Sequence, residues 1–151
     1  MTRSTNDSPL TTTTPKEPAM SVNLTAQDNS TIRTAAYGAI SLLAAASPKP
    51  SKAASAGTIA LTSATGLVGH VLAAKSKDIK LEGKTTAELA DHVLPALTAA
   101  VALLAAQDKA EADNFRATVN TAIEAAHAGQ PQSSPTMNEM TRKIIAALDA
   151  A

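Results

Sequence analysis

The chain has 151 residues, of which 34 are alanine, one is tyrosine, one is phenylalanine and none is tryptophan or cysteine. Its 13 basic and 13 acidic side chains give a formal net charge of zero. This composition excludes disulfides and thiolate metal sites, and it removes the general electrostatic basis for binding nucleic acid. Because alanine favours helices and strands favour aromatic residues, the composition also predicts an all-α protein.

The N-terminal segment, residues 1–30, is rich in threonine, serine, proline and asparagine and shows no apolar periodicity. Such a segment buries too little apolar surface to offset its ordering entropy, so we expect a disordered tail. Met20 offers a second translation start besides Met1, and the sequence leaves that choice open. Residues 31–151 are then expected to form a single helical domain.

Two helices are expected in the first half of this domain. Apolar residues every three or four positions predict a helix over 31–46, and the Ser-Pro-Lys-Pro sequence at 47–50 ends it. A second helix is expected over 51–75, although each of its three glycines costs roughly 1 kcal/mol relative to alanine. The polar stretch 76–84 is predicted to be a loop.

Three further helices are expected, each opening with a residue that caps helices and a glutamate three positions later. This spacing lets the two side chains bond free backbone amides of the first turn. The three pairs are Thr85 with Glu88, Asp108 with Glu111, and Thr136 with Glu139. Pro95 should kink or divide the first of these helices, and Gly129 is placed to end the second. We therefore predict a four- or five-helix, alanine-rich antiparallel bundle.

Charge is distributed unevenly along the chain. Residues 33–84 hold seven basic and two acidic side chains, a balance of +5, whereas residues 85–128 hold two basic and six acidic ones, a balance of −4. Exposed charges are screened beyond about 10 Å at 0.1 M salt, so this opposition predicts a salt-sensitive contact within one chain or between two. The basic half includes a lysine group that is either a solvated loop or a contact for an anionic surface: Lys75, Lys77, Lys80 and Lys84.

Candidate catalytic and metal-binding residues are few. Glu88, Asp91 and His92 share one helix face, while His70 and His127 lie on two other expected helices. No His-Glu-x-x-His or Glu-x-x-His element supplies facing metal ligands, and neither a Gly-x-Ser-x-Gly elbow nor a glycine-rich phosphate loop occurs. We therefore interpret the acidic cluster as a solvated helix face and predict a protein without catalytic, cofactor-binding or metal-binding residues.

A second interpretation places the protein outside the cell. Arg33 precedes the apolar run 35–46, and that run ends in Ala44-Ala45-Ala46, a small-residue site of the kind that signal peptidases accept. The run is therefore either the first bundle helix or the core of a signal peptide that ends near Ala46. The uncharged span 53–74 is long enough to cross a membrane, but its serines, threonines and glycines favour a closely packed bundle helix instead.

One resemblance bears on the C-terminal third. The segment 111–129, followed by Ser134, Glu139 and Ile-Ile-Ala-Ala-Leu at 144–148, resembles small uncharacterised bacterial helical proteins that are distantly similar to the tellurite-resistance B-like fold. The resemblance implies an all-α, cytoplasmic and stress-associated protein, and it transfers no metal-binding position. We accordingly expect a non-enzymatic cytoplasmic bundle that acts on an unknown protein partner or by self-association. The alternative is an exported or membrane-surface protein.

Overall fold

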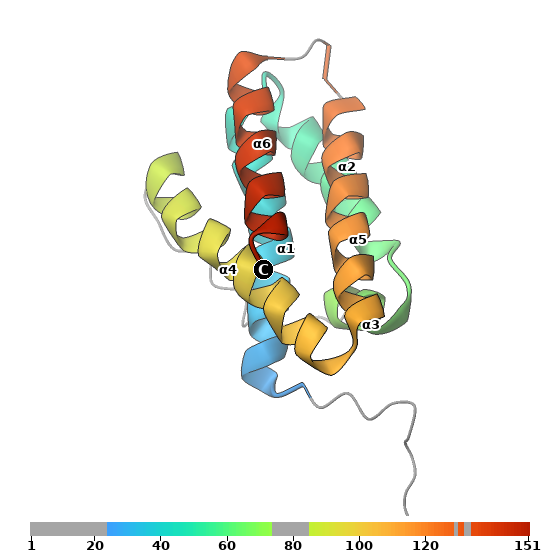
Figure 1. Ribbon diagram of the computed structural model, residues 1–151. Coiled ribbons are helices and arrows are strands. Elements are labelled where there is room, and N and C mark those ends of the chain that lie inside the picture. Colours follow the sequence, from blue (N-terminus) through green and yellow to red (C-terminus); the bar gives the residue numbers. More distant parts are fainter. Residues whose placement is uncertain (1–23, 74–84, 129, 132–133) are drawn as a thin grey trace, which may run out of the picture.

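The computed structural model describes residues 24–73, 85–128, 130–131 and 134–151. The predicted all-α class is confirmed, with six helices in the described residues in place of the predicted four or five. They are α1 (Ala26–Ala46), α2 (Pro50–Thr62), α3 (Gly66–Ala73), α4 (Thr86–Gln107), α5 (Lys109–Ala128) and α6 (Pro135–Asp149). Helices α1, α2, α5 and α6 run up and down alternately, and α4 crosses the bundle obliquely (Figure 1).

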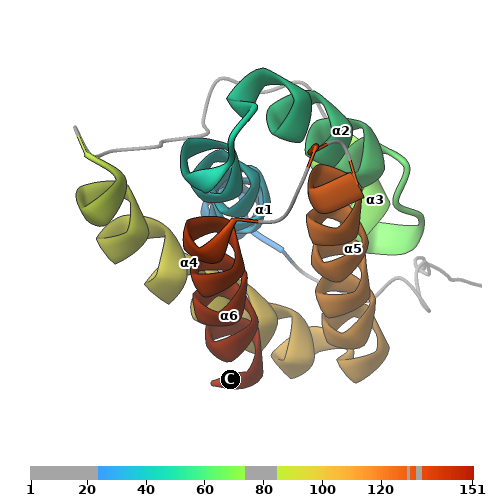
Figure 2. The same ribbon diagram turned by 90° about the horizontal axis from the view of Figure 1, so that it is seen from above.

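Helix α1 is the centre of the bundle. It contacts all five other helices, which surround it when the molecule is seen from above (Figure 2). Small residues let these neighbours approach closely: a Cβ on Gly57 of α2 would lie 2.7 Å from Cγ2 of Ile40. Buried residues therefore occur on every side of α1, and they are Ile32, Arg33, Thr34, Ala35, Ala36, Gly38, Ala39, Ile40, Leu42, Leu43 and Ala44.

Helix α1 begins five residues before the predicted start. Thr25 and Asp28 form a capping box, in which the Thr25 hydroxyl accepts from the Asp28 amide at 3.0 Å and the Asp28 carboxylate accepts from the Thr25 amide at 3.1 Å. The end of the segment predicted to be disordered, residues 26–30, is therefore helical. Residues 1–23 of that predicted tail lie outside the described residues.

The predicted single helix over 51–75 is wrong, because the chain forms two helices, α2 and α3, with a break between them. Gly66 has a φ of 71°, a left-handed conformation that costs most other residues roughly 1–2 kcal/mol. A Cβ on Gly69 would lie only 2.1 Å from the carbonyl oxygen of Ala64, so the turn packs against the helix that follows it. The uncharged span 53–74 is therefore not one continuous helix.

Side chains from two other helices satisfy both ends of α3. At its start, the Glu111 carboxylate of α5 accepts from the Val68 amide at 3.3 Å, and the Asn114 side chain donates to the Thr65 carbonyl at 2.9 Å. At its end, side chains of α1 donate to the last carbonyls: Arg33 to Val71 at 3.4 Å and Tyr37 to Leu72 at 2.7 Å. A helix too short to be stable alone is thus anchored by tertiary contacts.

The remaining helix starts largely follow the predictions. The Thr85 hydroxyl caps α4 by accepting from the Glu88 amide at 3.1 Å, and Pro95 lies inside α4 without dividing it. The cap of α6, however, is Ser134 and not Thr136, because Pro135 fits the first helical position, where no amide donor is needed. The predicted stop at Gly129 and the predicted loop at 76–84 lie outside the described residues.

The C-terminal helix is fixed to the bundle at its end. The Thr98 hydroxyl of α4 donates to the Ala147 carbonyl at 2.7 Å, and the Arg116 guanidinium of α5 donates to the Leu148 carbonyl at 3.2 Å. Both carbonyls belong to the last turn of α6, where the regular series of backbone hydrogen bonds ends. The orientation of α4 and α5 relative to α6 is thereby set.

Candidate interaction surface

The residues that the sequence offered as a metal site do not form one. Glu88 and Asp91 are exposed on α4, and His92 beside them is half-buried. His70 is exposed on α3, and Nε2 of His127 on α5 lies 2.8 Å from Oγ1 of Thr141 on α6. Within the described ranges, no three His, Asp or Glu side chains are placed to hold a metal ion. The lysine group at 75–84 lies outside those ranges.

Helix α4 combines a long apolar sequence with one side that its own chain leaves exposed. Residues 92–107 contain no Asp, Glu, Lys or Arg. Among the described helices, α4 alone is long and apolar enough to cross a membrane by length and composition, a test that buried core helices of soluble proteins also pass. Only 33% of its most apolar 18-residue window is buried, however. Exposed apolar residues gathered on one side of a helix make that side a candidate contact surface.

The geometry of α4 explains this exposure. Its inner stripe packs on α1 and α6 and is formed by Ala90, Val93, Leu97, Ala100, Val101 and Leu104. Its opposite stripe points outward because α4 lies across one side of the bundle, with no described helix beyond it (Figures 1 and 2). We call this second stripe the outer face of α4, and its exposed residues are Asp91, Pro95, Ala99, Ala102 and Ala106.

A groove borders this face where the C-terminal half of α4 passes the first turn of α1. It has a volume of about 480 Å³ and is lined by Asp28, Thr31, Ala99, Ala102, Leu103 and Ala106. We call it the α1–α4 groove. Its walls are mostly methyl groups, and the Asp28 carboxylate is the one ionised group among its lining residues.

A second groove lies between α5 and α6. It has a volume of about 490 Å³, with Ile123 and Ile145 among its apolar lining residues and Glu124 and His127 among its polar ones. Ile145 is 38% exposed, which makes it one of two large apolar side chains so exposed in the described residues. His127 of α5 and Thr141 of α6 lie within hydrogen-bonding distance of each other, and this contact connects the two walls of the groove.

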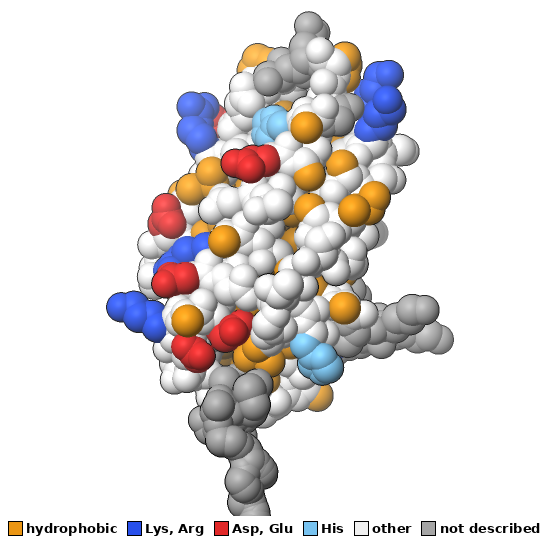
Figure 3. All heavy atoms as spheres, turned by 90° about the vertical axis from the view of Figure 1, so that its right-hand side faces the viewer, with side chains coloured by type: hydrophobic (Ala, Val, Ile, Leu, Met, Phe, Trp, Pro, Cys, Tyr) orange, Lys and Arg blue, Asp and Glu red, His pale blue; other side chains and the backbone are white. Residues whose placement is uncertain are grey.

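Charge differs between the faces of the bundle. The face shown in Figure 3 exposes both basic and acidic side chains, and Arg116 of α5 pairs with Asp113 at 3.0 Å. Helix α4, by contrast, has two acidic residues and no lysine or arginine along its length. The one basic side chain of α1, Arg33, is 6% exposed and bonds to α3. The outer face of α4 therefore has only acidic charge of its own.

Comparison with known proteins adds no relative. The chain matches no protein-family model, no curated protein and no solved structure. The outer face of α4 is therefore the feature from which a function can be inferred. The sequence carried a signal for this surface, the uncharged run 92–107, but a run of this kind is equally typical of a buried core helix.

Proposed function

We propose that the protein is a non-enzymatic, cytoplasmic helical bundle that acts through protein–protein interaction, with the outer face of α4 as its contact surface. The observation that carries this proposal is the exposed outer face of α4, because this helix is long and apolar enough to cross a membrane and 33% of its most apolar 18-residue window is buried. Contiguous apolar surface is costly to keep in water, and soluble proteins retain it mainly where a partner covers it.

The position of α1 supports a cytoplasmic location over export. The segment that resembles a signal peptide, residues 35–46, is the centre of the bundle and includes fully buried residues such as Leu42 and Leu43. Cleavage near Ala46 would remove the helix that contacts all the others, together with the Arg33 and Tyr37 side chains that hold α3. A role in stress response, which the C-terminal resemblance implies, is part of the same proposal.

The packing of α4 supports protein binding over membrane insertion. To enter a bilayer, α4 would have to withdraw Val93, Leu97 and Leu104 from the core, where each is fully buried. Each buried side chain of this size contributes roughly 1.5–3 kcal/mol to folding. The Thr98 bond to the end of α6 would be lost as well.

The native mass of the protein in extracts of its host tests this function. We expect wild-type protein to elute as an assembly larger than the purified chain, and the variant Ala102→Gln to elute at the purified size, because a longer polar side chain blocks the outer face. Ala117→Gln is the matched control, since Ala117 is exposed on α5 and does not line the α1–α4 groove. If Ala102→Gln assembles as wild type does, the outer face of α4 is not the contact surface.

A further inference from the structure

The charge and shape of the outer face of α4 restrict what can bind it. We propose that the outer face of α4, together with the α1–α4 groove beside it, binds an amphipathic helix of a partner protein, one that carries basic side chains beside a stripe of large apolar ones. This inference rests on the proposed function and names the partner's chemistry.

The outer face has the dimensions of a helix-binding surface. From Asp91 to Ala106 it runs along 15 residue steps of α4, which at 1.5 Å per residue is about 22 Å. A partner helix of about four turns matches this length. Helices that bind in grooves place apolar residues at three- and four-residue intervals, which suits a narrow stripe such as this one.

Side-chain size on α4 indicates what the partner supplies. The centre of the outer face is Ala99, Ala102 and Ala106, with half-buried Leu103 beside them. Alanine contributes little apolar area, so the gain on binding has to come from large side chains of the partner that enter the groove of about 480 Å³. Small residues on one helix also let a second helix approach closely.

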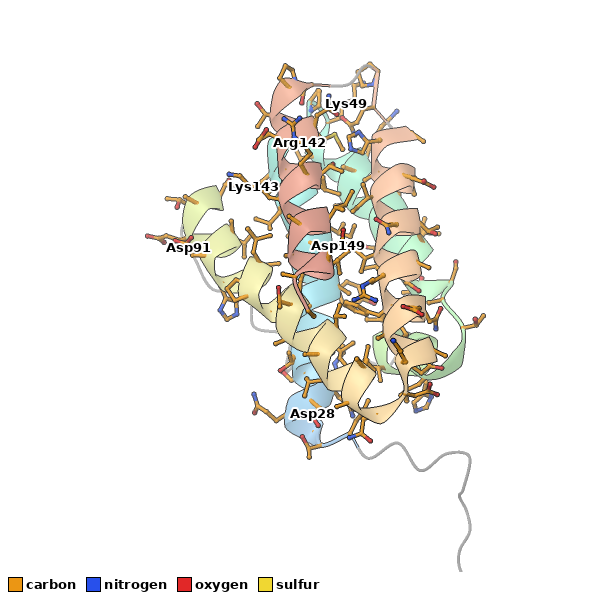
Figure 4. All side chains as sticks on the ribbon, viewed as in Figure 1. Asp28, Lys49, Asp91, Arg142, Lys143 and Asp149 are labelled. Carbon is orange, nitrogen blue, oxygen red and sulfur yellow. The ribbon has the colours of Figure 1, made fainter. Side chains whose placement is uncertain are left out.

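Acidic groups stand at both ends of the face. Asp91 points away from the bundle near the start of α4, and Asp28 lies in the first turn of α1 (Figure 4). Asp91 forms no ion pair among the described residues, and Asp28 uses one carboxylate oxygen for the Thr25 amide. Lys143, the basic residue labelled beside α4 in Figure 4, belongs to α6 and is not part of the outer face of α4. Lysine or arginine on the partner would complement both carboxylates, whereas acidic residues would be repelled.

The carboxylates of Asp91 and Asp28 disfavour three other occupants of this face: a second copy of the chain, an anionic membrane and a nucleic acid. A second copy that paired its α4 with this one would bring acidic residues to a helix that has no lysine or arginine between Thr86 and Gln107. Anionic membrane surfaces and nucleic-acid phosphates would be repelled for the same reason. The inference is therefore a basic protein helix.

Two synthetic peptides test this chemistry on the purified full-length protein. Both form four helical turns with the same leucine stripe, and one carries lysine where the other carries glutamate. We expect the lysine peptide to bind about tenfold more tightly at low salt, with the preference shrinking as salt rises. The variant Asp91→Lys should lose most of this preference, while Glu124→Lys, an equal change of charge on α5, should keep it.

Several results would overturn the inference. Equal binding of the two peptides, binding of neither, or tighter binding of the glutamate peptide would each contradict it. An equal loss of preference in Asp91→Lys and Glu124→Lys would show that only net charge matters. Binding to anionic lipid vesicles in preference to the lysine peptide would identify a membrane as the occupant. If these results occur while Ala102→Gln still disrupts the assembly, the partner chemistry fails and the proposed function stands.

Discussion

At the scale of single residues, Tyr37 shows how one side chain links two helices. Its hydroxyl donates to the Leu72 carbonyl at the end of α3, at 2.7 Å. Burial disfavours the ionised phenolate and raises the pKa of Tyr37, while the positive charge of nearby Arg33 lowers it by less. Because the folded pKa lies above the ordinary value of about 10, stability from this group is complete below that pH and is lost as pH rises through the folded pKa.

A spectroscopic titration tests this effect, since the chain has one tyrosine and no tryptophan. We expect the ultraviolet absorbance of the native protein to report a Tyr37 pKa above that of the same chain in denaturant. The variant Tyr37→Phe should be destabilised at neutral pH by about 1 kcal/mol, the typical value of one hydrogen bond, and should lose less stability above pH of about 10. A native pKa at or below the denatured one would contradict this interpretation.

At the scale of elements, capping residues and apolar spacing determine where most helices start. The break between α2 and α3 depends instead on contacts with a neighbouring helix. The start of α4 at Thr85 follows from its cap, and α5 follows the Asp108 signal closely. The start of α1 was missed because its capping box uses Asp28 in place of the usual Glu or Gln. The division between α2 and α3 depends on the left-handed Gly66 and on contacts with α5, which local sequence does not reveal.

The early start of α1 can be checked by removing its cap. Thr25→Ala deletes the hydroxyl that accepts from the Asp28 amide, and loss of such a cap typically costs about 1 kcal/mol. We expect this decrease in the free energy of unfolding by denaturant, with Thr25→Ser close to wild type because it keeps the hydroxyl. If Thr25→Ala is as stable as wild type, the helix does not depend on this cap.

At the scale of the whole molecule, the bundle is built around α1 and leaves α4 only partly covered. The core could be predicted in outline, because apolar residues recur every three or four positions along these helices, and Leu97, Phe115 and Ile144, which follow this spacing, are fully buried. The candidate surface could not, because the uncharged run 92–107 is equally compatible with a helix enclosed by its own chain. Only the oblique position of α4 beside α1 distinguishes the two.

The central claim is that a partner covers the exposed outer face of α4, and thiol labelling in the host tests it most directly. The chain has no cysteine, so Ala102→Cys and Ala117→Cys each provide a single thiol, one on the outer face of α4 and one on α5. We expect the two purified variants to react with a maleimide at similar rates, because both positions are exposed. In living host cells, we expect a membrane-permeant maleimide to label Ala102→Cys severalfold more slowly than Ala117→Cys. Equal rates in cells would contradict the account, because they would show that nothing covers α4.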